Sequence, residues 1–255
     1  MIADGIVFTF GKTTTYDTVA YLERRIPNSR RLDPKPSDDY LSEKIHDFQT
    51  DRDYEVDCRV VRFESGSKTI AVVPCKPGGK RAMQRIEQYV NESGILIGLG
   101  YLGQFDRGDN PPGKIVVPYK IKNSGSLREV VSNLPETVFP DGSIQDGLWR
   151  YISAGGFEST MESIHSVNDF GHPNAEEGFY GQEMETGVFV HFANSNQKRS
   201  GVVVVSGDPQ TGTASENIVI DGKITFQYKR DPRSVASIQF AADSILSFIS
   251  GISTD

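Results

Sequence analysis

The chain reads YEVDCRVVRFESGSKTIAVV from residue 54 to residue 73, and this stretch decides the fold that the sequence predicts. Apolar residues alternate with charged residues at its start, which is the pattern of a strand with one buried and one solvated face. Ser65-Gly66-Ser67 then predicts a turn, and Thr69 to Val73 predicts a returning strand. The stretch therefore predicts an antiparallel β-hairpin.

Further strands and helices are predicted on both sides of this hairpin. Strands are expected at residues 6–10, 95–105, 115–121, 187–193, 201–206, 218–220 and 224–228. Helices are expected at residues 16–26, 38–48, 82–89, 127–134 and 235–249. The turn-rich residues 106–113 predict a hairpin loop between two of the strands. We expect a β-rich α+β fold, with a mainly antiparallel sheet, a few flanking helices and a C-terminal amphipathic helix.

The length of 255 residues allows a sizeable core, and we expect residues 1–255 to form a single domain. Residues 123–147 are polar and rich in Pro and Gly, and they mark a soft boundary. The basic-to-neutral α+β part, 1–122, has 19 Lys/Arg and 17 Asp/Glu, a balance of +2. The acidic β-rich part, 148–255, lies in the region 123–255 that has 8 and 17, a balance of −9. Two poles of opposite charge favour head-to-tail self-association.

Composition also bears on location and partners. No apolar run approaches the roughly 18 residues of a membrane helix, and the N-terminus lacks the basic region of a secretory signal. We expect a cytoplasmic protein with no membrane or nucleic-acid partner. Cys58 and Cys75 are expected as reduced thiols, although a bridge between them stays open if their strands pair.

One candidate anion site follows a predicted strand and opens a predicted helix. Residues 74–81 read PCKPGGKR, and glycines at a helix start let a phosphate approach free backbone N–H groups. The alternatives are a nucleophilic Cys75 and an ordinary loop with solvated lysines. The residues expected to bind an anionic small molecule, or a phosphorylated or nucleotide ligand, are Lys76, Gly78, Gly79, Lys80, Arg81 and Arg85.

A second candidate site gathers histidines and carboxylates between residues 165 and 191. Imidazole and carboxylate together suit a divalent transition metal. The alternative is an acidic surface loop with scattered histidines. The expected ligands are His165, Asp169, His172, Glu177 and His191.

Two short resemblances accompany these sites. Residues 172–180 resemble the first metal motif of cupins, which implies a metal-dependent enzyme, but Phe170 stands where that motif has its first histidine. Gln182-Glu183-Met184-Glu185 has the biglutamate spacing of ADP-ribosyltransferases, without that family's upstream elements at a matching distance. Because every catalytic pattern fails at a required position, the leading expectation is a non-enzymatic binding or assembly protein, a self-associating structural subunit and homo-oligomer.

Overall fold

The computed structural model describes residues 2–35, 39–47, 52–104, 112–168, 178–209, 217–220, 223–226 and 231–252. The helices are α1 (Lys12–Arg25), α2 (Gly79–Tyr89), the short 3-10 helix η1 (Val90–Glu92), α3 (Gly125–Val130), α4 (Gly142–Ser153), α5 (Thr186–Ser195) and α6 (Pro232–Gly251). The first strands are β1 (Gly5–Phe10), β2 (Arg30–Arg31), β3 (Ser42–Asp47), β4 (Arg52–Asp57), β5 (Val61–Ser65), β6 (Lys68–Cys75) and β7 (Ile95–Gln104). The others are β8 (Ile115–Val116), β9 (Lys120–Asn123), β10 (Thr137–Val138), β11 (Ser159–Thr160), β12 (Ser163–Ser166), β13 (Gly181–Glu183), β14 (Arg199–Pro209), β15 (Asn217–Ile220) and β16 (Lys223–Phe226).

Four parallel strands form the centre of the large sheet, in the order β6-β1-β7-β14. Their side chains are buried on both faces. In β1, Ile6 and Phe8 point into one core and Val7 points into the other. In β14, Val202 and Val203 divide in the same way. Parallel strands with both faces covered have continuous apolar sequences, and these strands have them.

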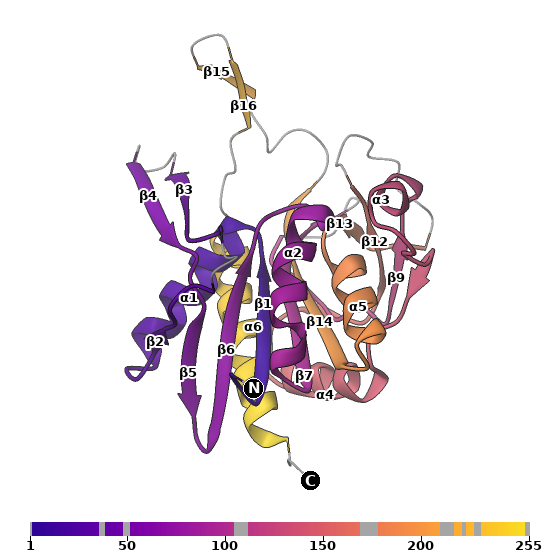
Figure 1. Ribbon diagram of the computed structural model, residues 1–255. Helices are drawn as coiled ribbons and strands as arrows, with labels where there is room; N and C mark the ends of the chain where they lie inside the picture. Colours follow the sequence, from indigo (N-terminus) through magenta and orange to yellow (C-terminus); the bar gives the residue numbers. More distant parts are fainter. Residues whose placement is uncertain are drawn as a thin grey trace.

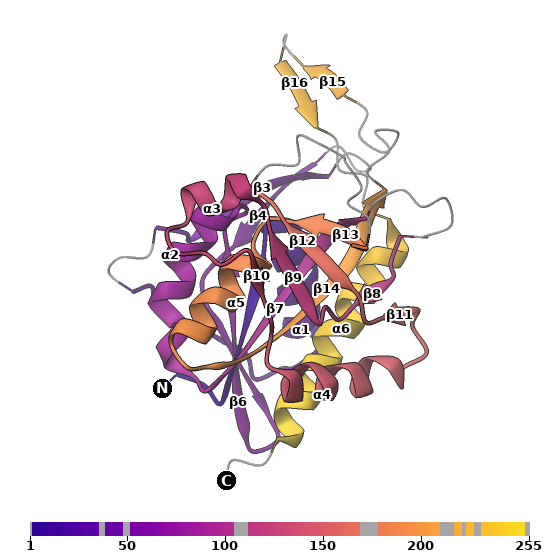
Figure 2. The same cartoon turned by 90° about the vertical axis from the view of Figure 1, so that its right-hand side faces the viewer.

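Helices cover both faces of this sheet. Residues of α2 and α5 pack into the core that contains Ile6 and Phe8. Residues of α1, α4 and α6 pack into the core that contains Val7. Figures 1 and 2 show the resulting three layers, with the sheet between the two groups of helices. This is a helix–sheet–helix arrangement of the α/β class.

Beyond the central strands, the sheet continues through shorter ones. One side follows the order β13-β12-β9-β10, in which β12 is parallel to both β13 and β9. On the other side β8 pairs with β14 and with β11. The hairpins β3–β4 and β15–β16 form two separate two-stranded sheets.

The expectation of a mainly antiparallel sheet is wrong. The sheet is mixed, and its longest pairings are parallel. The predicted hairpin of residues 54–73 is present only in its second part, because β5 pairs with β6 while β4 pairs with β3. Strand β6 also pairs with β1, and this parallel pairing of strands far apart in the sequence leaves no local signal.

Three other expected elements differ. Residues 42–47, expected within a helix, form β3, because they pair along their whole length with β4. Residues 187–193, expected as a strand, belong to α5, whose Val188, Phe189 and Val190 are fully buried. The strands at 95–104 and 115–116 do not pair with each other, since both pair with β14.

The structure also bears on the expectations about domains, membrane helices and cysteines. Strand β14 pairs with β7 over ten residues of β7, which links the two sides of the 123–147 segment, and we keep the single domain as a proposal on this basis. Within the described residues, no helix combines the length and the apolarity needed to cross a bilayer. Cys58 and Cys75 are both buried, and neither forms a disulfide.

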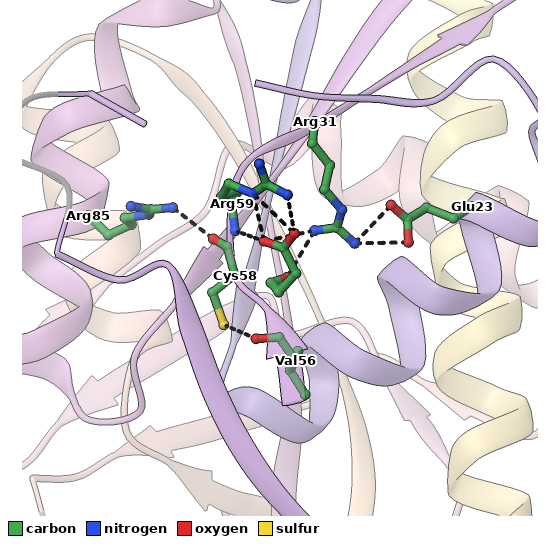
Figure 3. A network of polar contacts seen from close by, with 7 residues as sticks. Glu23, Arg31, Val56, Cys58, Arg59 and Arg85 are labelled. Carbon is green, nitrogen blue, oxygen red and sulfur yellow. Dashed lines mark hydrogen bonds and ion pairs between the residues drawn. The ribbon is translucent and has the colours of Figure 1, made fainter. Parts of the chain in front are cut away.

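A polar network fixes the connection between β4 and β5 (Figure 3). Asp57 accepts hydrogen bonds from the Arg59 guanidinium, at 2.7 Å from Nη2. Arg31 lies 3.3 Å from Asp57 and 2.8 Å from Glu23 of α1. On the other side Arg85 of α2 donates to the Cys58 carbonyl at 2.9 Å. The connection is thereby tied to helices on both faces of the sheet.

Candidate functional site

The candidate site lies at the carboxyl edge of the central sheet. Because β1, β6, β7 and β14 are parallel, their carboxyl ends meet at one edge. Ligands of α/β proteins bind outside this edge, where the strand arrangement changes. The edge is therefore the first place to look for a ligand site.

The arrangement changes along β7, which is longer than β1. Strand β14 occupies one side of β7 from Ile95 to Gln104. On the other side, β1 pairs with residues 95–99 and β13 pairs with Gly103 and Gln104. On this side of β7, the pairing strand therefore changes from β1 to β13 between residues 99 and 103. Glu185, directly after β13, contacts Gly78 in the segment after β6, so the chain after β13 lies at the carboxyl ends of these strands.

The loop after β6 is hydrogen-bonded to the segments after β1 and β13. The Gly11 N–H, directly after β1, donates to the Cys75 carbonyl at 3.1 Å. Gly78 has a φ of +93°, a conformation that suits glycine, and it caps the start of α2. Its N–H donates to the Glu185 carboxylate at 2.5 Å. The loop after β6 and the loop after β13 therefore meet at Glu185.

Glu183 fixes the segment that follows β13. Its carboxylate accepts hydrogen bonds from the backbone N–H groups of Glu185, at 2.5 Å, and Thr186, at 2.7 Å, and from the Thr186 hydroxyl. These N–H groups belong to the start of α5, where backbone donors lack helical partners and negative charge is favoured. Glu183 is 1% exposed, so its role is to cap α5 from inside the protein.

At Gly187, the start of α5 lies in close contact with the ends of β9 and β12. A Cβ atom at Gly187 would lie 1.8 Å from Oδ1 of Asn123, at the end of β9. The Gly187 N–H donates to the Ser166 hydroxyl, at the end of β12, at 3.3 Å. Only glycine fits between these groups, and its presence places Glu183 and Glu185 against the ends of the strands.

The two glutamates differ in their electrostatic state. Burial, followed by the charge of Glu183, raises the pKa of Glu185 to about 8. Burial also raises the pKa of Glu183, while the donors from Thr186 oppose that rise. Burial and the nearby Glu185 raise the pKa of the Cys75 thiol well above its usual value. The donors to Glu183 include the Thr186 hydroxyl and two backbone N–H groups, and these hydrogen bonds favour its charged form. Buried carboxyl groups with shifted pKa values are typical of functional sites.

Asp208 brings a third acidic residue to the same edge. It is the last residue but one of β14, and a bulge lies between Ser206 and Pro209. Pro209 and Gly181 both stand opposite Gln104 of β7. Asp208 is therefore at the same height in the sheet as the start of β13.

The residues of the expected anion site do not form one anion cradle. The Gly78 N–H is taken by Glu185, and Gly79 packs against Met184 and Leu127. Arg85 is buried and donates to the carbonyls of Pro74, at 3.1 Å, and Cys58. Lys76, Arg81 and Arg85 do line one cavity of about 480 Å³ between α2 and residues 39–40, together with Asp39 and Glu87. Lys80 lies outside this lining, on the exposed first turn of α2. An anion there stays a prediction.

The expected metal ligands are only partly within the described residues. Asp169, His172 and Glu177 lie outside them. His165 is on β12, and His191 is on α5, so the strand geometry expected for His191 is wrong. In the part of the chain that the structure describes, no group of three or more His, Cys, Asp or Glu residues is arranged to hold a metal ion. The full ligand set stays a prediction.

Glu185 is a candidate site residue that belongs to neither of the two sites predicted from the sequence. Its pair spacing with Glu183 was visible, but the two side chains have different tasks. The useful signal was the position of Glu183-Met184-Glu185 between a short strand and an apolar segment, where an acidic residue caps a helix. The partner Gly78 is 107 residues away and could not be assigned.

Solved structures show which proteins share this fold. No family model matches the chain, and no curated protein is similar to it in sequence. Uridine phosphorylase from Vibrio fischeri has a TM-score of 0.71 at 12% identity, over 99% of this chain and 93% of that one. Purine nucleoside phosphorylase from Toxoplasma gondii has 0.70 at 11% identity, over 97% and 90%. The 5'-methylthioadenosine/S-adenosyl homocysteine nucleosidase from Campylobacter jejuni has 0.66 at 10% identity, over 97% and 99%.

These similarities show the α/β fold of nucleoside phosphorylases and nucleosidases, with its mixed sheet. They contradict the expectation of a non-enzymatic, self-assembling structural protein, because the proteins that share the fold are nucleoside-processing enzymes. The physical reason for the error is that the candidate site is built from segments after β1, β6 and β13, which are far apart in the sequence, so no contiguous motif spans them.

Proposed function

We propose that the protein is an enzyme that cleaves the N-glycosidic bond of a nucleoside. The observation that carries this proposal is the buried Glu185, held by Gly78 at the carboxyl edge of a sheet that has the nucleoside phosphorylase and nucleosidase fold. A nucleoside is the small-molecule ligand that these fold relatives have in common by name.

The chemistry requires three tasks. The bond between the sugar C1' and the base nitrogen breaks, and its electron pair leaves with the base. Positive charge develops on the sugar, and the oxygen of water or phosphate then forms the new bond to C1'. The base gains a proton from a carboxylic acid, and the carboxylate that this leaves takes up the proton that an attacking water loses. A carboxylate beside the sugar stabilises the positive charge, and a carboxylic acid supplies the proton.

We assign the sugar to Glu185. One of its oxygens accepts from Gly78, and a carboxylate has acceptor sites for further donors. Neighbouring sugar hydroxyls are such donors, and their hydrogen bonds favour the ionised form. Ionised Glu185 then lies beside the sugar as positive charge develops. Its burial strengthens this interaction, because the local dielectric constant is low.

We assign the proton transfer to Asp208. It is a titratable residue at the end of β14, on the other side of β7 from the loop that carries Glu185. By strand register, residues 185 and 208 lie on opposite sides of β7, so a ligand that spans β7 would reach both residues.

The direct test is base release. The purified protein is incubated with purine and pyrimidine nucleosides, with and without phosphate, and free base is measured by chromatography. We expect release of at least one base, and a Glu185→Gln variant to lose about 100-fold in kcat/KM. Glu129→Gln, an exposed position on α3, is the matched control and should retain activity. No base release from any nucleoside under either condition would contradict the proposal.

Two expectations about the whole molecule stay proposals beside this function. A homo-oligomer would show as a mass above 28.2 kDa in light scattering at low and high salt, and a clean monomer at both would contradict it. A cytoplasmic location is proposed from the amino-acid composition and is tested by fractionation of cells that express the chain.

A further inference from the structure

Gln182, in the middle of β13, is a buried side chain with an unused donor. The residue is 2% exposed. Its amide nitrogen, Nε2, finds no acceptor in the part of the chain that the structure describes. Burying an N–H donor without a partner destabilises a protein, so such groups are rare and call for an explanation.

The direction of Gln182 follows from its neighbours. Side chains alternate along a strand, and Glu183 points toward the start of α5. Gln182 therefore points to the opposite face of the sheet. On that face its neighbours across the sheet are Gly103 of β7 and His165 of β12. The His165 ring lies 5.8 Å from the ring of Phe179, which adds an aromatic surface beside the amide.

Gly103 separates Gln182 from the carboxyl end of β14. The pairing of β14 with β7 places residues 207–208 opposite Gly103, between Ser206 at Leu102 and Pro209 at Gln104. Gln182 and Asp208 thus flank a residue that has no side chain. Two strand spacings put their backbones about 10 Å apart.

We propose that Gln182 is a specificity-determining residue that donates a hydrogen bond to a carbonyl oxygen of the nucleobase. This inference rests on the proposed function, and it narrows the substrate class to nucleosides whose base has an oxo group. A carbonyl oxygen accepts from Nε2, whereas an exocyclic amino group at the same place only donates. In the orientation that the structure gives the Gln182 amide, an amino base would leave both donors buried and unpaired, and a site built for a hydrogen bond rejects a ligand that cannot form it.

The test compares two pairs of nucleosides that differ at one exocyclic group, inosine with adenosine and uridine with cytidine. We expect the wild type to favour the oxo member of the pair that it cleaves by at least about tenfold in kcat/KM. In Gln182→Leu, kcat/KM for the oxo nucleoside falls by about 10- to 100-fold, and that for the amino nucleoside stays within about threefold. Gln84→Leu, an exposed glutamine on α2, is the control and keeps the wild-type preference.

Folding and binding measurements test the role of Gln182 separately from the proposed nucleoside cleavage. Gln182→Leu removes an unpaired donor, so its Tm should equal or exceed that of the wild type. Calorimetry with the free bases should show tighter binding of hypoxanthine than of adenine, and loss of this difference in Gln182→Leu. A wild type that cleaves no nucleoside contradicts the proposed function, while the base titration still judges Gln182. A preference for amino members, a preference retained in Gln182→Leu, or no difference between the two bases overturns the inference.

Discussion

Two buried glutamines, at equal depth, have opposite surroundings. Gln145 of α4 and Gln182 of β13 are each 2% exposed. The Gln145 amide donates to the carbonyls of Pro118, at 2.5 Å, and Val202, at 3.2 Å, and accepts from the Val202 N–H at 2.8 Å. The Gln182 amide nitrogen has no acceptor among the described residues. Gln145 joins α4 to β14 by hydrogen bonds, whereas the amide nitrogen of Gln182 lies at the carboxyl edge of the sheet without an acceptor among the described residues.

The glutamates of the site repeat this difference on a smaller scale. Glu183 accepts hydrogen bonds from Glu185, Thr186 and Ser166 and caps α5, whereas Glu185 accepts only from the backbone N–H groups of Gly78 and Met184 among the described residues. Polar groups that are fully paired stabilise the fold. Polar groups that are buried and incompletely paired cost stability and mark the place where a ligand completes the set. Variants in the two regions should therefore change different quantities.

The largest effect is expected from Asp208→Asn at the carboxyl edge. If Asp208 supplies the proton, kcat should fall by about 10²- to 10⁴-fold, because an amide cannot act as the acid. The Tm should change little. Steady-state kinetics and a thermal melt on the same sample check both expectations. Full activity in Asp208→Asn would remove this residue from the mechanism.

Gln145→Leu should lower stability and leave activity unchanged. It leaves the carbonyls of Pro118 and Val202 and the Val202 N–H without their side-chain partner. At roughly 1–3 kcal/mol for a buried unpaired group, the free energy of unfolding should fall by about 3 kcal/mol. Urea unfolding measures this change, and activity per folded molecule should stay at the wild-type level. A variant as stable as the wild type would break the contrast between the two glutamines.

The pH dependence should separate stability from activity at Glu185. Its pKa of about 8 in the folded protein is above the unfolded value of about 4.3. The folded state binds the proton more tightly, so this stabilising contribution is complete below about pH 4.3 and is lost as the pH rises to about 8. The ionised form is the active one in our proposal, so kcat/KM should rise about tenfold from pH 7 to its plateau.

Glu185→Gln removes this titration, so both pH trends should flatten between pH 4.3 and 8. Chemical denaturation at several pH values follows stability, and initial rates follow activity. The proposal for Glu185 would not stand if the wild-type rate were constant across that range.

The smallest effect is expected at Lys76. Its Nζ lies 3.4 Å from the carboxylate of Asp39, which is mostly exposed, and exposed ion pairs contribute about 0–1 kcal/mol. Lys76→Ala should therefore shift the free energy of unfolding by less than about 1 kcal/mol. If phosphate protects the wild type from thermal unfolding and does not protect Lys76→Ala, the cavity beside α2 binds the anion that the sequence predicts.

Much of the secondary structure could be predicted from local patterns, but the sheet could not. The strands around residues 6–10 and 69–73 and the C-terminal helix follow from apolar spacing and turn residues. The parallel pairing of Val7 with Val72 and Ile97 depends on segments far apart in sequence. Residues 187–193 are rich in Val and Phe, which favours a strand, yet burial on several sides and the Glu183 cap make them helical.

The candidate site was less predictable than the fold. The glycines and basic residues after β6 were identified as a ligand loop, but the group that contacts Gly78 is the protein's own Glu185. Local sequence can show that a loop offers N–H donors. It cannot show that a carboxylate 107 residues further along the chain occupies one of them.

The pairing of β7 with a strand much later in the sequence has a consequence during protein synthesis. Strand β7 ends at residue 104, and β14, which pairs along one whole side of it, begins only at residue 199. A nascent chain that has emerged only as far as α4 exposes that side of β7 as an open apolar edge, which is prone to pair with other chains. Ribosome-bound intermediates of this length should therefore recruit chaperones, and fragments that end before residue 199 should aggregate.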